Sequence, residues 1–543
     1  MRPTSRVFAA LALLLLARCG GSSGNAPPPC TVISVTVTVS PAFIVAGMTS
    51  TLTATVDASS SCTGGVTWSA TPTGTLTPSG TTATFTAASP ATYMIRATST
   101  ADSSRSGTAT VTVPGPVACG EANGVVITHP TDVLASDTWA GDGITHLLPN
   151  TLAVKGAATL TVAPCAVVAL GAGVSITALD TARIVAAGTS GTRFVTFRRA
   201  DASQAWGGLR GLTEQARIDL AFTHLEGGGA VAGANTVKTV IRVSGSGVID
   251  RLPTPVLRVN TVTIRGSADT GVYLENQAAF TPDSQALTIV GSAGRPINLG
   301  MMALASLPGG TYTGNGIDEV LVIGPNADVF ADLTVEDRGV PISIPAVGMN
   351  VAPPSGQSAP VTLTLRPGVV LKFPKTGGRP GTRVIFGTNG NEPNNRVGVL
   401  NAVGTAARPI TFTSGEANPA PGDWIGLWLN TANGSRLDHV NIEYAGAPSG
   451  IISGNCRAVG TDDAAALLIG DFSPQYVPPV DLITNSRIAS SAGFAINAMW
   501  QAPTVAAPDL TATNVFQSNA RCRQTFNALT MGVCPVGGGC TAN

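Results

Sequence analysis

Two long stretches of this chain repeat the same order of short apolar segments, and this repetition constrains the fold more than any single motif does. The first copy contains residues 160–168, 187–189, 195–197 and 206–209. The second contains residues 363–370, 403–405, 410–412 and 424–427, at offsets of 203, 216, 215 and 218 residues. Chance similarity does not keep such an order. The sequence therefore predicts stacked structural repeats, with copies at about 127–275 and 320–500.

Within each copy, the segments have the length and residue types of strands, and Gly, Asn, Asp and Ser turns separate them without any helical periodicity. Parallel strands that are joined by turns must follow one another around a coil. Coils of roughly 22 to 25 residues would give on the order of 16 turns. We predict an all-β fold in which residues 127–543 form a long right-handed parallel β-helix.

The composition agrees with such a fold and argues against one class of partner. Charged residues make up only 11% of the chain, whereas about a quarter is usual. The 63 glycines and 38 prolines favour strands and tight turns over long helices. Because Lys plus Arg and Asp plus Glu are equal at 31 each, and no basic stripe is present, we do not expect nucleic-acid binding.

The amino terminus has the pattern of an export signal. Arg2 and Arg6 precede an apolar run at residues 7–17, which is short for a membrane span and suits a signal peptide. Residues 16–19, which end in Cys19, resemble a bacterial lipobox, and a Gly/Ser tether follows at 20–30. Arg18 departs from the small residue that lipoboxes carry before the cysteine. The resemblance implies lipidation at Cys19 and a location at the outer membrane or cell surface, with secretion as the alternative.

The cysteine count fits an exported chain. Nine cysteines are present, so removal of Cys19 from the count leaves an even number that can form disulfides. Proximity in sequence favours four pairs, although other pairings are open: Cys30 with Cys62, Cys119 with Cys165, Cys456 with Cys522, and Cys534 with Cys540. No cysteine spacing fits a zinc site, and the four histidines are scattered.

Residues 31–113 predict a separate β-sandwich, followed by a linker at 114–126. Residues 35–39 alternate apolar and polar with period two, and about six or seven such segments occur in about eighty residues. Trp68 and Tyr93 match the packing tryptophan and the corner tyrosine of immunoglobulin-like sandwiches. We therefore expect both side chains to have structural roles.

Two resemblances follow from these motifs. Residues 31–113 resemble the bacterial Ig-like group 2 family in the order of segments such as 66–69, 84–87 and 95–99. That family supplies spacers or adhesive modules of surface proteins and implies no catalytic residue. Residues 409–412 and 421–427 are similar to β-helix surface proteins of bacteria, which are related in fold to pectate lyases. This second resemblance implies a fold but no substrate.

Few residues suggest chemistry. Asp438, His439 and Glu443 lie on one predicted strand, where alternation places His439 and Glu443 on the same face. His439 and Glu443 are the candidate catalytic residues. The first copy has Asp219, Leu220 and His224 at the positions aligned with Asp438, His439 and Glu443, so the repeat does not reproduce the group. Asp462 and Asp463 could bind Ca²⁺, and no other cofactor or metal is expected.

Other side chains have candidate binding or structural roles. Trp428 and Tyr444 are candidates for stacking against sugar rings, whereas Trp206 and Trp424 recur at matched positions and are expected to pack. Four asparagines beside β-branched segments are expected to form hydrogen bonds between successive coils: Asn260, Asn441, Asn485 and Asn514.

These observations favour a non-catalytic structural and adhesive protein of the cell surface. In this hypothesis the β-helix presents a lateral binding face to a polysaccharide or another surface ligand, and the lipid anchor supplies the membrane contact. One alternative is a polysaccharide lyase or glycoside hydrolase of the β-helix type. The other is a purely architectural protein of the envelope.

Overall fold

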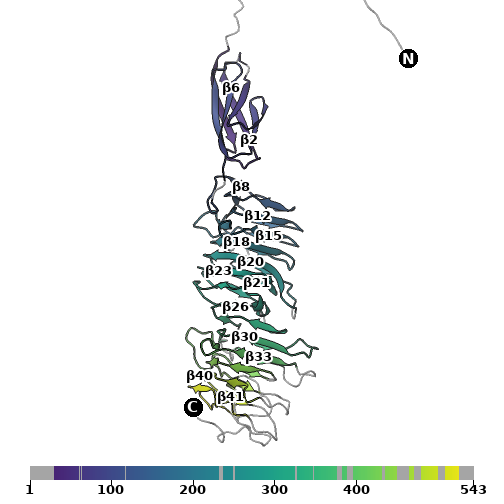
Figure 1. Ribbon diagram of the computed structural model, residues 1–543, viewed down its shortest axis with the longest axis vertical. Coiled ribbons are helices and arrows are strands. Elements are labelled where there is room, and N and C mark those ends of the chain that lie inside the picture. The colour runs from purple at the N-terminus through teal and green to yellow at the C-terminus, as the bar shows by residue number, and fades with distance from the viewer. Residues whose placement is uncertain are drawn as a thin grey trace, which may run out of the picture. The chain divides into compact units, whose positions relative to one another are not determined.

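A computed structural model gives the fold of two separate compact units, which divide after Gly115. The structure describes residues 30–59, 61–62, 64–115, 118–230, 237–248, 251–324, 327–345, 348–375, 382–387, 396–430, 434–448, 464–469, 479–498 and 508–524. Both units are built from strands, and a single short 3-10 helix, η1 (Met301–Ser306), is present in this described part (Figure 1). The predicted all-β fold is confirmed.

The first unit is an immunoglobulin-like sandwich of two antiparallel sheets. In the order of their strands, the sheets are β1-β2-β5-β4 and β3-β6-β7, which is the arrangement of a seven-stranded immunoglobulin domain. The strands are β1 (Val32–Ser40), β2 (Thr49–Ala58), β3 (Val66–Thr71), β4 (Thr75–Ser79), β5 (Thr82–Thr86), β6 (Ala91–Ser99) and β7 (Ser106–Val113).

The sandwich core uses the residues that the sequence singled out. The Tyr93 ring is buried, and its hydroxyl donates a hydrogen bond to the Ser89 carbonyl at 2.7 Å, as a corner tyrosine does. Trp68 packs against the same core. Cys30 and Cys62 form a disulfide, as predicted. The predicted structural roles of Trp68 and Tyr93 are therefore confirmed.

The second unit is a parallel β-helix whose longest sheet has thirteen strands in the described part of the chain. We call it the long sheet. Its strands, in spatial order, are β11 (Leu152–Val154), β14 (Ile176–Ala178), β17 (Leu209–Gly211), β19 (Thr239–Ser244), β21 (Thr270–Glu275), β24 (Ile297–Leu299), β26 (Val320–Val322), β28 (Ile342–Ser343), β31 (Val370–Phe373), β34 (Ile410–Ser414), β37 (Val440–Glu443), β40 (Arg487–Ala489) and β42 (Val515–Gln517).

A twelve-stranded sheet accompanies the first half of the long sheet and consists of two rows. One row contains β8 (Val126–Thr128), β10 (Thr145–Leu148), β13 (Val167–Leu170), β16 (Val195–Arg199), β18 (Arg217–Glu226), β20 (Thr254–Arg265), β23 (Gln285–Val290) and β25 (Gly310–Thr311). The other contains β9 (Asp137–Trp139), β12 (Thr159–Val162), β15 (Arg183–Ala187), the starts of β18 and β20, and β22 (Ala278–Phe280). The rows share β18 and β20 because Phe222 and Thr261 turn these strands with positive φ angles of 42° and 57°.

Two five-stranded sheets accompany the second half. One contains β27 (Leu333–Val335), β30 (Val361–Leu365), β33 (Gly398–Val403), β36 (Arg436–Asp438) and β39 (Ile483–Thr484). The other contains β29 (Met349–Val351), β32 (Arg383–Phe386), β35 (Gly426–Leu429), β38 (Ala465–Ile469) and β41 (Phe494–Ala498). Most coils therefore contribute three strands, one to each face of the β-helix, and between β24 and β25 the helix η1 takes the place of a strand.

The predicted length of a coil holds near the start and again in the middle of the β-helix, where Val272 pairs with Ile297 and Val320 with Ile342. Thr145 pairs with Val167 and Leu152 with Ile176, which are steps of 22 and 24 residues. Val370 pairs with Thr411 and Ile442 with Ile488, which are steps of 41 and 46 residues. The estimate of about 16 turns was therefore too high for the described residues, because longer connections between strands lengthen the other coils, most of all in the second half.

The two sequence copies do not place equivalent strands in the same sheet. β13 belongs to the twelve-stranded sheet, whereas its counterpart β31 belongs to the long sheet. Likewise, β17 belongs to the long sheet and its counterpart β35 to a five-stranded sheet. Because the long sheet runs without a break through both copies, equivalent outward-facing residues of the two copies lie on different faces.

The inward contacts of the two copies nevertheless match. Trp206 and Trp424 are both fully buried in one continuous core. The Trp206 Nε1–H donates to the Glu226 carbonyl at 2.8 Å, and the Trp424 Nε1–H donates to the Glu443 carbonyl at 2.7 Å. The predicted packing roles of both tryptophans are confirmed. The Trp206 ring is bonded to the end of β18, and the Trp424 ring is bonded to the end of β37.

We predict that Trp206→Phe and Trp424→Phe destabilise the β-helix by similar amounts. Each change removes an N–H donor and leaves a carbonyl without it, which costs about 1 to 3 kcal/mol before the loss of ring volume is counted. Chemical denaturation, monitored for each unit, would measure the change. Trp68→Phe is the matched control and should affect only the sandwich transition. A variant of Trp206 or Trp424 with unchanged stability would contradict the shared role.

Candidate functional site

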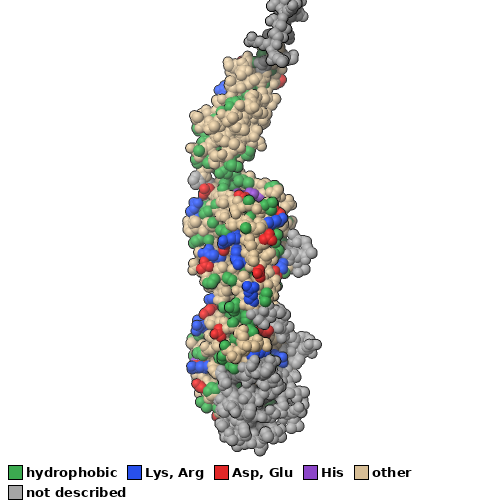
Figure 2. Space-filling model, turned by 90° about the vertical axis from the view of Figure 1, so that its right-hand side faces the viewer, with side chains coloured by type: hydrophobic (Ala, Val, Ile, Leu, Met, Phe, Trp, Pro, Cys, Tyr) green, Lys and Arg blue, Asp and Glu red, His purple; other side chains and the backbone are tan. Residues whose placement is uncertain are grey.

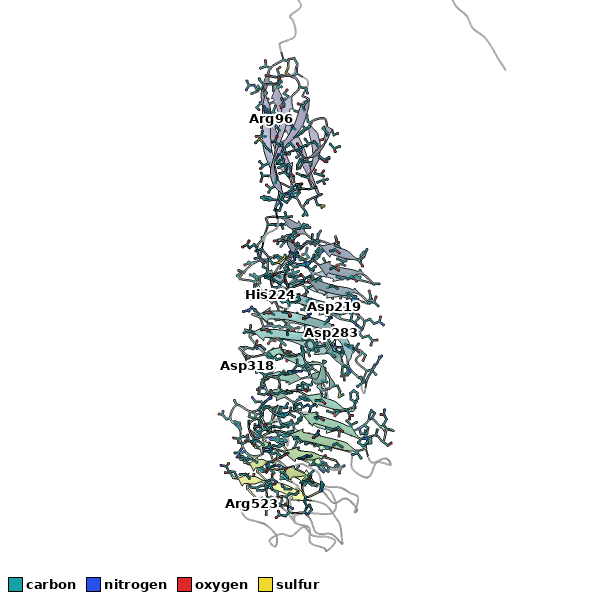
Figure 3. The ribbon with its side chains drawn as sticks, in the orientation of Figure 1. Arg96, Asp219, His224, Asp283, Asp318 and Arg523 are labelled. Carbon is teal, nitrogen blue, oxygen red and sulfur yellow. A yellow bond between two sulfur atoms is a disulfide. The ribbon has the colours of Figure 1, made fainter. Side chains whose placement is uncertain are left out.

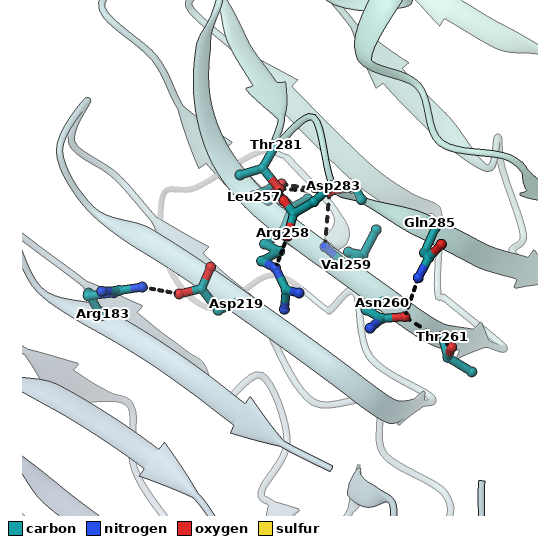
Figure 4. A network of polar contacts seen from close by, with 11 residues as sticks. Arg183, Asp219, Leu257, Arg258, Val259, Asn260, Thr261, Thr281, Asp283 and Gln285 are labelled. Carbon is teal, nitrogen blue, oxygen red and sulfur yellow. Dashed lines mark hydrogen bonds and ion pairs between the residues drawn. The ribbon is translucent and has the colours of Figure 1, made fainter. Parts of the chain in front are cut away.

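Polar side chains on the outer faces of the β-helix are linked from coil to coil (Figure 4). The Arg183 guanidinium forms an ion pair with Asp219 on the next coil, and the Arg258 Nε–H donates to Asp283 Oδ2 at 2.6 Å. Gln285 Nε2 donates to Asn260 Oδ1 at 3.2 Å. Basic and acidic groups are interspersed over the β-helix in Figure 2. Figure 3 places Asp219, Asp283 and His224 within this unit. Paired charges and amides thus occur on the lateral surface.

Glu443 follows this pattern at the end of β37. Its carboxylate forms an ion pair with Arg487 of the next coil and accepts a hydrogen bond from the Thr413 hydroxyl of the preceding coil at 3.4 Å. The Glu443 side chain is therefore bonded to the neighbouring strands on both sides of it in the long sheet, β34 and β40. A general acid or nucleophile needs a carboxylate that can reach a substrate proton or carbon, and this carboxylate is engaged by a cation.

His439 does not lie on a strand with Glu443. It has a positive φ of 51° and forms the corner between β36 and β37, so the alternation that placed the two side chains on one face does not apply. The His439 Nδ1 is 3.0 Å from Asp438 Oδ1. Four residues of extended chain span about 13 Å between the Cα atoms of residues 439 and 443. The predicted shared face of His439 and Glu443 was therefore wrong.

The corner also corrects the sequence alignment of the two copies. Phe222, with a φ of 42°, occupies the corner of the first copy that His439 occupies in the second. The carbonyls that accept the Trp206 and Trp424 hydrogen bonds then align Glu226 with Glu443. The first copy thus has a glutamate at the position of Glu443, whereas we had aligned His224 there. It has no histidine at the position of His439.

Asp438, the residue before this corner, accepts hydrogen bonds from the next coil. Thr484 Oγ1 and Asn485 Nδ2 donate to its Oδ1 at 3.1 Å and 2.9 Å. Partial burial pulls the pKa of Asp438 upward, but the hydrogen bonds from Asn485 and Thr484 and the charges of His439 and Arg436 outweigh it and lower the pKa. The carboxylate therefore stays ionised at neutral pH and helps to fix the corner.

The two candidate stacking residues differ in environment. The Trp428 side chain points away from the main core but is only 6% exposed, and it packs with Ile385, Ala465 and Leu468 in a separate apolar cluster. Its ring has no open face for a sugar. Tyr444 is half-buried at a corner with a φ of 60°, and its carbonyl accepts from the Gly422 and Asp423 N–H groups. Of the two, Tyr444 retains an exposed part.

The four asparagines do bond between coils, although not to one another. Asn260 accepts from Gln285, Asn441 donates to Thr411 Oγ1 at 3.4 Å, and Asn485 donates to Asp438. Asn514 Oδ1 accepts from the Ser486 N–H at 2.8 Å, and its Nδ2 donates to the Ile483 carbonyl. Their structural roles are confirmed, with mixed partners in place of an asparagine ladder.

Several candidates lie outside the described residues: Cys19, Asp462, Asp463, Cys456, Cys534 and Cys540. Cys522 is disulfide-bonded, and Cys119 pairs with Cys165 as predicted. Within the described ranges, no group of three or more His, Cys, Asp or Glu side chains is arranged to hold a metal ion. A search of the same ranges found no helix with the length and apolar character of a membrane span.

A histidine pair in the first coils was missed by the sequence reasoning. His146 lies on β10, points into the core and is 1% exposed. Its Nε2 is 2.8 Å from the Ala140 carbonyl and its Nδ1 is 2.9 Å from His129 Nε2. The Trp139 ring stacks on both imidazoles, with centroids at 4.1 Å and 5.2 Å. The three rings close the core where the coils begin. In the sequence the histidines are far apart, and no motif indicates that His129 and His146 lie together.

The hydrogen bonds fix the protonation of this pair. A carbonyl only accepts, so His146 Nε2 carries the proton and neutral His146 Nδ1 accepts from His129 Nε2–H. Burial, with a smaller contribution from the neighbouring His129, lowers the pKa of His146 to about 4, although the Ala140 carbonyl and Asp137 oppose the shift. Burial also lowers the pKa of His129. The pair therefore remains neutral inside the folded protein at neutral pH.

We predict that the stability of the β-helix falls as the pH is lowered from about 6.5 to 4. In this window the unfolded chain binds a proton at His146 that the folded chain excludes, which lowers the unfolding free energy by on the order of 3 kcal/mol. His146→Gln keeps a donor and an acceptor but does not titrate, so the slope should become shallower. Denaturation at several pH values would measure it. An unchanged slope would contradict this assignment.

No protein-family model matches this chain. No curated protein matches it either.

Proposed function

We propose that this chain is an exported, lipid-anchored protein of the outer membrane or cell surface that binds a ligand along its β-helix without turning it over. The sandwich, which resembles bacterial Ig-like group 2 domains, acts as a spacer or adhesive module. The expected ligand is a polysaccharide or another component of a cell surface. Contacts would be made at several coils at once.

The observation that carries this proposal is the state of the lateral polar groups. Glu443 is paired with Arg487, Asp219 with Arg183, and Asp283 with Arg258, each between neighbouring coils. Paired side chains on a rigid sheet can offer hydrogen bonds to sugar hydroxyls, but they are poorly suited to move protons. The two disulfides in the described residues fit an oxidising compartment.

A binding and turnover screen tests the proposal. Residues 20–543 would be offered acidic and neutral polysaccharides in the presence of Ca²⁺, and bound polymer and newly formed chain ends would be measured together. We expect binding without new ends. Release of unsaturated or reducing ends that disappears in Glu443→Gln would establish a lyase or hydrolase instead. The absence of both bound polymer and new chain ends would favour a purely architectural role.

We predict that Cys19→Ser moves the protein out of the membrane. The lipobox resemblance makes Cys19 the lipidated residue, and acyl chains provide about 0.8 kcal/mol of membrane affinity per buried CH₂. Detergent phase partitioning of cells that express either form would test this: the original chain should enter the detergent phase and Cys19→Ser the aqueous phase. Aqueous partitioning of both forms would show that Arg18 prevents lipidation. Arg18→Ala is then the variant expected to restore it.

A further inference from the structure

An arginine on the outer face of the long sheet is buried without a carboxylate partner. Arg210 is the central residue of β17, between Leu209 and Gly211, which face the core. Alternation directs Arg210 outward. Its side chain is nevertheless only 5% exposed. A guanidinium in such a place normally has an anionic partner, because an unpaired buried charge is costly.

The hydrogen bonds of Arg210 leave part of its guanidinium unused. Its Nε–H donates to Ser175 Oγ at 3.1 Å. Its Nη1 is buried and has no hydrogen-bond partner among the described residues. The Ser175 Oγ also accepts from the Gly208 N–H at 3.1 Å, so the proton of the Ser175 hydroxyl remains available to donate. The Arg210 guanidinium and the Ser175 hydroxyl beside it therefore each keep one unused donor.

The carboxylate of Glu275, which acts on the charge of Arg210, is already bound by another arginine. Arg242 occupies the position next to Arg210 on the following coil. Its guanidinium binds Glu275 through Nε–Oε1 at 3.1 Å and Nη2–Oε2 at 2.8 Å, a bidentate pair. On the other side, the neighbour of Arg210 is the uncharged Thr177. One positive charge is thus left over at Arg210.

This charge cannot be removed by deprotonation. Burial lowers the pKa of Arg210 and the charge of Arg242 lowers it further, while Glu275 opposes the shift. An arginine nevertheless stays protonated in proteins at any ordinary pH. The free energy of the folded state would therefore fall if an anion accepted the Nη1–H and the Ser175 hydroxyl proton.

We propose that Arg210, together with the hydroxyls of Ser175 and Thr177, forms a binding site for a carboxylate or a similar small oxyanion on the outer face of β17. The planar guanidinium suits the two oxygens of a carboxylate. The ligand is a free small anion or the carboxyl group of an acidic sugar. The site does not depend on the proposed adhesive function, because acetate alone is sufficient to occupy it.

The second copy lacks this site. The repeat position of Arg210 is occupied by Trp428, whose neighbours in register are Ile385 and Leu468. A cation with free donors in one copy is thus replaced by an apolar row in the other. The two copies therefore present different chemistry at equivalent positions, and only the first is suited to an anion.

Thermal unfolding with added anions tests the site. The chain of residues 20–543, its Arg210→Met variant and an Arg198→Met control would be compared in acetate, galacturonate and neutral galactose at constant ionic strength. Arg198 is an exposed arginine on β16, so its replacement removes one positive charge without altering the site. A ligand that binds only the folded state raises the midpoint with the logarithm of its concentration once that concentration exceeds the Kd.

We expect acetate to raise the midpoint by a few degrees in the original chain and in Arg198→Met, and not in Arg210→Met. Stabilisation by acetate and galacturonate but not galactose would indicate that an acidic sugar can reach the site. Stabilisation by acetate alone would restrict the site to small anions. Equal responses in all three proteins, or no response in the original chain, would overturn the proposal.

A second measurement does not require a stable variant. The ¹³C line width of labelled acetate reports binding to the original chain directly. Broadening that declines as unlabelled acetate competes for the site is expected. Broadening that does not change when unlabelled acetate is added would overturn the proposal, even if Arg210→Met fails to fold.

Discussion

The parallel hydrogen bonds between successive coils are the constraint on which the second unit depends. Each coil satisfies its backbone donors and acceptors only through the coils before and after it, so no coil is stable alone. The same pairing fixes register, and register fixes which side chains face the core. One continuous apolar core then runs from Val133 to Leu510. The rings of His129, Trp139 and His146 stack on one another in its first two coils.

The same register gives the lateral surface its chemistry. An outward side chain meets the side chains one coil away, at the strand spacing of about 4.8 Å, and can pair with them. Arg183 with Asp219 and Glu443 with Arg487 arise in this way. Such pairs cover the surface with few net charges. Arg210 is different, since its possible partner Glu275 is bound to Arg242.

Much of the fold could be predicted from the sequence, because it depends on features that repeat. Trp206 and Trp424 were assigned to packing from their matched positions, and their indole hydrogen bonds agree. The corner at His439 was missed, because a strand and a turn with one left-handed residue have the same apolar pattern. The exchange of sheets between the copies was also missed, since it depends on pairing across many residues. Arg210 lacks an anionic partner because Glu275 binds Arg242 instead, and the sequence alone does not show which of the two arginines binds Glu275.

The central claim is that the β-helix binds along its length and not at one pocket. Binding that extends over several coils should strengthen as the ligand spans more of them. The most direct measurement is therefore the affinity for a series of oligosaccharides of increasing length, taken from whichever polysaccharide binds. The account predicts that affinity continues to rise as the oligosaccharide grows past the span of one coil. An affinity that reaches its maximum with two or three sugars would contradict it and would indicate a single localised site.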